Sequence, residues 1–264
     1  MSRQPEGPPP PPVVQRLRIR YCKRGRLRFT SHRDVARAFE RAIRRAGLPI
    51  AYSAGFTPHP KVSYVGAAPT GAASEAEYLE IGLAEQREPE QVRRALDAAL
   101  PDGIGVVEVV DAATSGTRTL AERIAASRWK IVLPQVAEPD LEAAVERLMA
   151  QPSVPVERPV KDGRRAVVDV RAALVRLEAG SEPAPSDSQA DNGPLSDRYA
   201  TLDVVVQHST PAVRPDDILT ALRTAAGLST PVTAVVTRLA QGLVDETSPQ
   251  GAERLLDPLV EPGG

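Results

Sequence analysis

The order in which two hydrophobic periods alternate along residues 16–110 is the feature that most limits how this chain can fold. From Arg16 to Cys22 every second residue is apolar, with Leu17, Ile19 and Tyr21 on one face. This alternation is typical of a half-buried strand. Arg26–Thr30 repeats the pattern after a short turn, so we expect a hairpin or a continued strand there.

The helical period begins after Ser31, which we expect to cap a helix. Asp34 follows three residues later and can reach back toward the cap, as in a capping box. Gly47 and Pro49 then end the helix. The residues expected to form its buried stripe are Val35, Ala38, Phe39, Ala42, Ile43 and Ala46.

The rest of this region completes a recognisable plan. We predict strands at Leu48–Ser53, Glu77–Ala84 and Ile104–Val110, and a helix from Pro89 to Leu100. Residues 54–73 are rich in glycine and proline and are expected to form a long irregular segment. The resulting order, β-α-β-β-α-β, is the ferredoxin-like plan.

A second copy of the plan is expected downstream. Its predicted elements are a strand at Trp129–Leu133, a helix at Asp140–Ala150, strands near Val154–Val160, Ala166–Glu178 and Tyr199–His208, a helix at Pro215–Ala226 and a strand at Val232–Leu239. We therefore predict an α+β chain of two tandem ferredoxin-like (βαββαβ) halves with antiparallel sheets.

The boundaries follow from composition. We expect a disordered proline-rich arm at 1–14, a first lobe at 15–112, a linker at 113–128 with a helical turn near Leu120–Ala126, a second lobe at 129–241 and a flexible tail at 242–264. Residues 180–197 are acidic and of low complexity, which predicts a disordered insertion in the second lobe.

The formal net charge of -1 hides a strong segregation of charge. Residues 1–73 hold 14 lysines and arginines against three acids, whereas the remainder holds 19 bases against 31 acids. Such an asymmetry favours an anionic partner for the basic part. The alternative is a solvated basic helix face balanced by acidic surface elsewhere.

Several classes of protein are excluded by what the sequence lacks. No apolar run approaches the roughly 20 residues that span a bilayer, and the N-terminus does not resemble a secretory signal. Cys22 is the single cysteine, so an internal disulfide framework and a cysteine-bound zinc or iron–sulfur site are excluded. No nucleotide-binding glycine motif or serine nucleophile elbow is present. We expect a cytoplasmic protein without a cofactor or a metal.

The strongest remaining candidates for site residues are two histidines and their neighbours. His32 stands in the first turn of the first helix, where it can act as a base or donate to a phosphate held at the helix start; its alternative is an ordinary residue beside a cap. His59 lies between two prolines that fix the backbone, with Phe56 and Lys61 nearby. That loop can hold a phosphate and stack a base, or it can be a rigid loop whose phenylalanine fills the core.

The other candidates surround these two positions. Arg37, Arg41, Arg44 and Arg45 line one side of the first helix and can follow a phosphate backbone, although two of them also suit the helix C-terminus. Glu75 or Glu77 can pair with the basic helix or with His59, or can simply be solvated at a strand start. Arg28 and Ser31 complete the set of candidate RNA-binding or substrate-binding residues.

Three blocks of this sequence resemble a known family. They are Ser31-His32-x-Asp34; Arg41-x-x-Arg44-Arg45-Ala46-Gly47-Leu48-Pro49-x-Ala51-Tyr52-Ser53-x-Gly55-Phe56-x-Pro58-His59-Pro60-Lys61; and Pro69-x-Gly71-x-x-Ser74-Glu75-x-Glu77-Tyr78. The chain is similar to the radical SAM-linked family of unknown function, densely over residues 16–110 and more loosely to about 240. The resemblance implies a radical SAM enzyme as partner and gives more weight to His32 and His59. The chain has no cysteine cluster motif, so it would be the separate partner and not the radical enzyme itself.

Three functions are therefore open. The leading hypothesis is a non-catalytic protein that binds RNA or another phosphate-bearing substrate through its basic N-terminal lobe. The first alternative is a ribonuclease or transferase that uses His32 and His59 as acid and base, with Lys61 stabilising an anion. The second is a protein–protein adaptor for a radical SAM enzyme.

Overall fold

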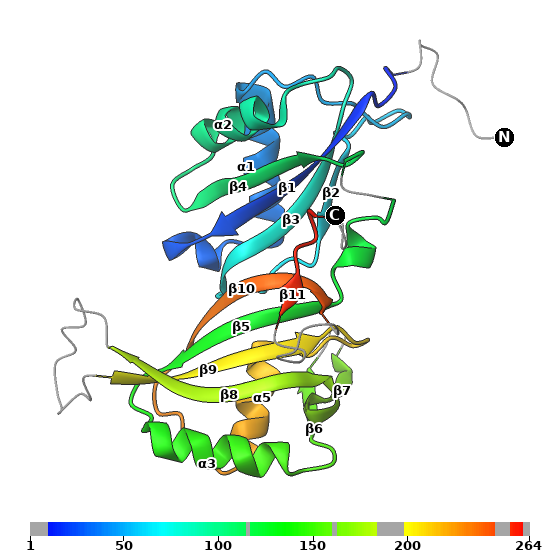
Figure 1. Ribbon diagram of the computed structural model, residues 1–264. Helices are drawn as coiled ribbons and strands as arrows, with labels where there is room; N and C mark the ends of the chain where they lie inside the picture. The colour runs from blue at the N-terminus through cyan, green and yellow to red at the C-terminus, as the bar shows by residue number, and fades with distance from the viewer. Residues whose placement is uncertain (1–9, 115–116, 160–162, 184–197, 246–253, 261–264) are drawn as a thin grey trace. The chain divides into compact units, whose positions relative to one another are not determined.

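The computed structural model describes residues 10–114, 117–159, 163–183, 198–245 and 254–260 (Figure 1). The chain divides into two compact units, one formed by Met1–Ile124 with Leu256–Gly264 and the other by Ala125–Leu255. Both units combine a mostly antiparallel sheet with a few helices, so the prediction of an α+β protein is confirmed. The predicted arm at 1–14 and the insertion at 180–197 lie largely outside the described residues.

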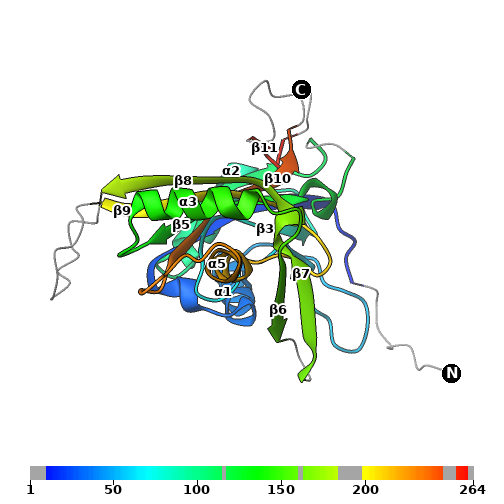
Figure 2. The ribbon, with the colours of Figure 1, turned by 90° about the horizontal axis from the view of Figure 1, so that it is seen from below.

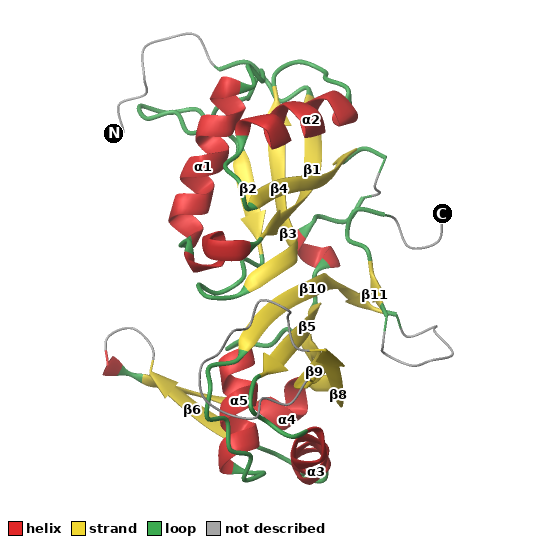
Figure 3. Ribbon diagram, turned by 90° about the vertical axis from the view of Figure 1, so that its left-hand side faces the viewer, coloured by secondary structure: helices red, strands yellow, loops and turns green. Residues whose placement is uncertain are grey.

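The first unit carries the basic part of the sequence. Its elements are β1 (Gln15–Lys23), the 3-10 helix η1 (Gly25–Phe29), α1 (His32–Arg45), β2 (Val62–Val65), β3 (Ala73–Leu83), α2 (Pro89–Ala99), β4 (Ile104–Asp111) and the 3-10 helix η2 (Ala121–Arg123). The strands pair antiparallel in the order β4-β1-β3-β2. In Figure 3, α1 and α2 lie across one face of this sheet.

The core of the first unit lies between those helices and the sheet. Alternate residues of β1 and β3 point into it, and the predicted stripe of α1 meets them. Tyr21 packs edge-on against Phe39, with ring centroids 4.8 Å apart. The largest members of this core are Leu17, Ile19, Tyr21, Phe39, Ile43, Leu79, Ile81, Leu83 and Leu96. Its helical and alternating periods are the ones that the sequence displays.

The second unit has a corresponding order of elements. They are β5 (Ala126–Leu133), α3 (Glu138–Met149), β6 (Pro155–Pro159), β7 (Arg165–Asp169), α4 (Val170–Ala173), β8 (Leu174–Pro183), β9 (Arg198–Gln207), α5 (Pro215–Thr224) and β10 (Val235–Val244), followed along the chain by the short β11 (Leu255–Leu256). The sheet order is β10-β5-β9-β8, again antiparallel. β6 and β7 form a separate two-stranded ribbon (Figure 2).

Three predicted strands are wrong in the structure. Residues 26–29 belong to η1 and Thr30 is its C-cap, because Gly25 has a φ of 56° and turns the chain out of the strand direction. Residues 48–53 form only two isolated bridges, and the second strand is β2, inside the segment predicted to be irregular. Residues 166–178 do not form one strand: α4 interrupts them, and Asp169 caps it by accepting a hydrogen bond from Ala172 N.

The predicted linker and tail also contribute structure. β5 begins three residues before the predicted strand at Trp129, and η2 lies in the predicted linker. In the predicted tail, β10 continues to Val244 and Leu259 is buried. Leu259 packs with Ala76, Tyr78, Leu120 and Ile124 on the sheet face opposite to the helices.

Candidate nucleic-acid interface

The start of α1 is fixed by Ser31. Its hydroxyl accepts a hydrogen bond from Asp34 N at 3.2 Å and donates one to the Asp34 carboxylate at 2.7 Å. The capping prediction is confirmed for the serine, while the Asp34 side chain binds the Ser31 hydroxyl. His32, the first residue of the helix, is exposed, and its ring meets Tyr64 of β2 edge-on at 5.0 Å between centroids.

The outer side of α1 is a ridge of arginines. The helix contains five arginines and two carboxylates, and Arg37, Arg41, Arg44 and Arg45 are all exposed. Arg44 and Arg45 donate to main-chain carbonyls, of Glu40 at 3.3 Å and Ala99 at 3.4 Å. The one ion pair that this helix forms among the described residues is the long contact between Arg37 and Asp34, at 3.4 Å. The ridge therefore keeps its positive charge.

The arginines of β1 have a different environment, although the sequence makes them equally basic. Arg16 and Arg18 lie beside Glu80, at 3.0 and 3.5 Å. Arg20 pairs with Glu108 at 3.2 Å and with Asp257 at 3.3 Å. Arg18 is buried and also donates to the Arg118 carbonyl at 2.7 Å. Their charge is balanced inside the unit, so the free positive charge lies on the helix side.

A closed loop extends from the chain beside α1. Ser53 N donates to the His59 carbonyl at 2.9 Å, and His59 N donates to the Ser53 hydroxyl at 3.0 Å, so the two ends of the loop are fastened together. Gly55, with a φ of 128°, allows the turn that any other residue would strain. Phe56 at the tip is 69% exposed, which rules out the alternative that it fills the core. His59 and Lys61 are exposed at the base of the loop.

A small cavity lies between the C-terminal half of α1 and the base of this loop. It measures about 170 Å³ and is lined by Glu40, Ile43, Arg44, Ile50, Tyr52 and Pro60. Neither Glu40 nor Tyr52 is among the candidate site residues predicted from the sequence. In the sequence, a single glutamate on a basic helix has the pattern of a solvated residue. Tyr52 reaches the cavity only because it forms a β-bridge with Pro60.

Tyr64 lies in the same strip between α1 and β2. Its hydroxyl is buried and has no hydrogen-bond partner among the described residues. Burial, together with the Glu40 carboxylate, raises the pKa of Tyr64 above its usual range. The hydroxyl therefore stays neutral at physiological pH.

The two candidate histidines lie near different parts of α1. His32 contacts Tyr64 at the first turn, whereas Pro60, the residue after His59, lines the cavity with Glu40 and Arg44. Residues 32 and 40 are separated by about 12 Å along a helix axis. Among the described residues, no hydrogen bond or ring contact joins the two imidazoles.

The remaining candidates have structural partners. Glu75 binds Arg24 at 2.7 Å, and this hydrogen bond raises the pKa of the arginine. Glu77 is buried and accepts a hydrogen bond from Ala68 N at 3.0 Å. The Arg28 guanidinium lies 4.6 Å from the centroid of the Phe29 ring. The partner of Glu75 is therefore Arg24, and not the basic helix or His59.

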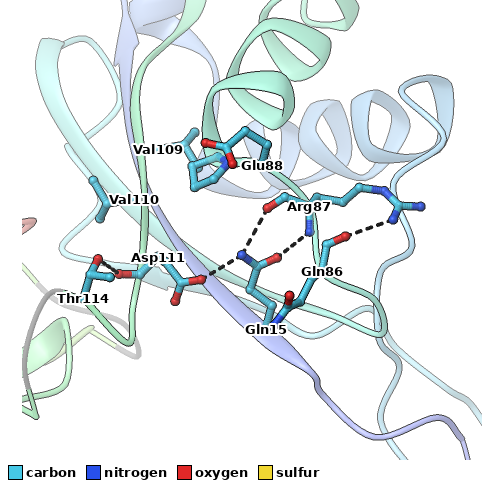
Figure 4. Close-up of a pocket in the computed structure, with 9 residues that line it drawn as sticks. Gln15, Gln86, Arg87, Glu88, Val109, Val110, Asp111 and Thr114 are labelled. Carbon is cyan, nitrogen blue, oxygen red and sulfur yellow. Dashed lines mark hydrogen bonds between the residues drawn. The ribbon is translucent and has the colours of Figure 1, made fainter.

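A larger polar pocket of about 610 Å³ lies at the other edge of the first unit, between β1, α2 and β4 (Figure 4). The Gln15 amide crosses it, donating to the Arg87 carbonyl at 3.1 Å and to Asp111 at 2.7 Å, and accepting from Arg87 N at 2.8 Å. These bonds hold the start of β1 to the end of β4. The pocket carries no cluster of cations comparable with the ridge.

The described residues contain no group of three or more histidine, cysteine, aspartate or glutamate side chains that could hold a metal ion. Within the same part of the chain, no helix has the length and apolar character needed to cross a membrane.

Comparison with known proteins gives one family. Residues 16–215 match the family model described as "Uncharacterized protein conserved in bacteria (DUF2344)". No curated protein matches the chain.

Among solved structures, the chain is similar to variants of DypB from Rhodococcus jostii RHA1 in complex with heme. One variant is 12% identical over 86% of this chain and 92% of its own, with a TM-score of 0.22. A second is 14% identical over 85% and 93%, with a TM-score of 0.21. TM-scores this low carry no argument about fold or function.

Proposed function

Because this chain belongs to a family of uncharacterized proteins conserved in bacteria, we propose its function from its own surface: the first unit binds RNA through the arginine ridge of α1 and the adjoining loop. One observation carries the proposal. The arginines of β1 are paired with carboxylates, whereas the ridge offers cations that carbonyl contacts leave charged. A line of cations with a 5.4 Å helical repeat can follow a phosphate backbone.

The loop supports the same proposal. Phe56 is the most exposed large apolar side chain of the described residues, and the same loop carries His59, with Lys61 two residues further along the chain. An aromatic ring next to cations is the combination by which proteins hold unpaired bases and their phosphates together. The fastened ends of the loop keep the ring presented without a large entropic cost on binding.

We also propose that both units are ferredoxin-like halves. The orders β4-β1-β3-β2 and β10-β5-β9-β8 correspond position by position when the β6–β7 ribbon is treated as an insertion. In each unit the two long helices follow the first and third strands of the plan. An experimental structure would test this assignment through the same strand orders.

The test of RNA binding is fluorescence anisotropy with a labelled single-stranded 20-mer at several salt concentrations. Arg41→Glu with Arg45→Glu should weaken binding, and it should lower the slope of log affinity against log salt by about 1.4, since each lost phosphate contact contributes about 0.7. Arg93→Glu with Arg94→Glu on α2 is the matched control, because it makes the same change in net charge on the neighbouring helix.

Two results would overturn the proposal. The first is no retention of RNA by the wild-type protein at low salt. The second is an equal loss of affinity in the α1 and α2 variants, which would assign the binding to net charge alone. Intact RNA after prolonged incubation would also count against the alternative of a His32 and His59 ribonuclease.

Action beside a radical SAM enzyme is a further proposal, and it rests on the family resemblance of residues 31–78 alone. That this action takes place in the cytoplasm is also a proposal, and it rests on the single cysteine and on the absence of a long apolar run or a secretory signal from the sequence. The adaptor hypothesis predicts that the two proteins copurify after coexpression. If copurification requires RNA and is lost after nuclease treatment, the RNA is the bridge and the adaptor hypothesis fails.

A further inference from the structure

The cavity beside α1 has the lining of a pocket for one planar ring. Ile43, Ile50 and Pro60 give it apolar walls, and the Tyr52 ring adds an aromatic surface that is 37% exposed. The charged groups of the lining come from one element only, through Glu40 and Arg44 of α1. A cavity of about 170 Å³ with this lining suits a small flat heterocycle and excludes a bulky or highly charged ligand.

Glu40 is the unusual member of this lining. It is a carboxylate on a helix with five arginines, yet its side chain forms no hydrogen bond or ion pair with any described residue. Arg44 binds the main-chain carbonyl of Glu40 and not the carboxylate. A carboxylate only accepts hydrogen bonds, so the group that it would bind in this cavity must donate them.

We propose that this cavity takes one unstacked base of single-stranded RNA, with Tyr52 against the base and Glu40 accepting from its exocyclic amine. The proposal rests on the RNA binding proposed above, and it adds which bases and which form of RNA the surface prefers. Adenine, cytosine and guanine carry an exocyclic amine, whereas the only base donor of uracil is its ring N3–H, which lies between two carbonyls that a carboxylate repels. The bases of a duplex are stacked and paired, so a duplex cannot fill the cavity.

The residues around the cavity indicate where the backbone of such a strand would run. Pro60 lines the cavity and Lys61 follows it, while Arg41 and Arg45 flank Arg44 on α1. The loop that starts at Tyr52 and returns at Pro60 carries Phe56. A strand with one base in the cavity therefore meets cations on both sides and an aromatic ring for a neighbouring base.

The experiment compares the affinities of labelled 12-mers of oligo(A), oligo(C) and oligo(U) and of a 12-base-pair RNA duplex. Wild-type protein should bind oligo(A) and oligo(C) about tenfold more tightly than oligo(U), the usual gain from a hydrogen bond to a charged group. Glu40→Ala should abolish this preference. It should also raise the affinity for oligo(U), because a negative charge is removed from a basic surface.

Three controls separate the base pocket from other effects. Glu142→Ala makes the same change at an exposed position of α3 and should keep the preference. Tyr52→Ala should weaken single-stranded binding, whereas Tyr52→Phe, which keeps the ring, should not. Circular dichroism establishes that each variant is folded.

The outcomes distinguish the two proposals. Binding of all three oligomers with equal affinity, unchanged in Glu40→Ala, overturns the base pocket and leaves RNA binding by the ridge intact. Tighter binding of the duplex than of the single strands also overturns it. Absence of binding to any RNA overturns both proposals.

Discussion

Single side chains decide where the positive charge of this protein is available. Arg18 and Arg41 come from the same basic segment, but Arg18 is 4% exposed beside Glu80 and Arg41 is exposed on α1. The difference depends on strand pairing, which places Arg18 opposite Glu80. Helical spacing predicted the ridge that contains Arg41, whereas the partner of Arg18 depends on strand register, which no local property of the sequence gives.

Ser31 has a testable contribution to the start of α1. Ser31→Ala removes the acceptor for Asp34 N and the donor to its carboxylate, so we expect a loss of about 1 kcal/mol in the free energy of unfolding. Urea denaturation followed by circular dichroism measures it. Ser31→Asp keeps a capping oxygen beside a second carboxylate, and it should recover only part of the loss. A Ser31→Ala protein as stable as the wild type would show that the cap contributes nothing.

Asp169 gives the protein a defined dependence on pH. Hydrogen bonds from the Ser153 hydroxyl at 2.7 Å and from Val154 N at 3.0 Å lower the pKa of Asp169. A carboxyl whose pKa is lower in the folded state stabilises the fold above its unfolded pKa, and this contribution disappears as the pH falls through the folded pKa. The difference in stability between wild type and Asp169→Asn should therefore be constant near neutral pH and shrink below about pH 4. A difference that does not change with pH would contradict this role.

Helices and strands differ in how far the sequence determines them. The period of α1 and its cap are local, and both were predicted. β2 was not, because Val62–Val65 become a strand only through pairing with residues 78–81 of β3. Residues 26–30 have a strand-like alternation that the turn at Gly25 overrides. The candidate loop was found from its prolines and histidine, but the cavity at its base needed the long-range Tyr52–Pro60 bridge.

The two faces of the first unit should respond in opposite ways to removal of an arginine. Arg18→Met leaves Glu80 with Arg16 alone and the Arg118 carbonyl without this donor, so we expect a loss of about 1–3 kcal/mol in stability and an unchanged RNA affinity. Arg41→Met should change stability by less than about 0.5 kcal/mol and weaken RNA binding. Urea denaturation and anisotropy on both variants measure the two effects. Equal effects of the variants on RNA binding would contradict the division between the faces.

Across the full chain, the most informative long-range contact is the return of the C-terminal segment to the first unit. Leu259 is 2% exposed among Ala76, Tyr78, Leu120 and Ile124, and Arg123 donates to the Val260 carbonyl at 3.0 Å. The sequence was interpreted as a flexible tail because two short apolar clusters have no detectable period. These apolar residues become buried only when the sheet of the first unit has formed the face against which they pack.

Leu259→Ala should therefore destabilise the first unit by about 2–4 kcal/mol, since it opens a cavity in a packed cluster. Val260→Ala, at a side chain that is 57% exposed, is the matched control and should change stability by less than about 0.5 kcal/mol. Hydrogen–deuterium exchange locates the effect: peptides that contain residues 76–78 and 120–124 should exchange faster in Leu259→Ala. Unchanged exchange in these peptides would mean that the C-terminal segment does not hold the first unit together in solution.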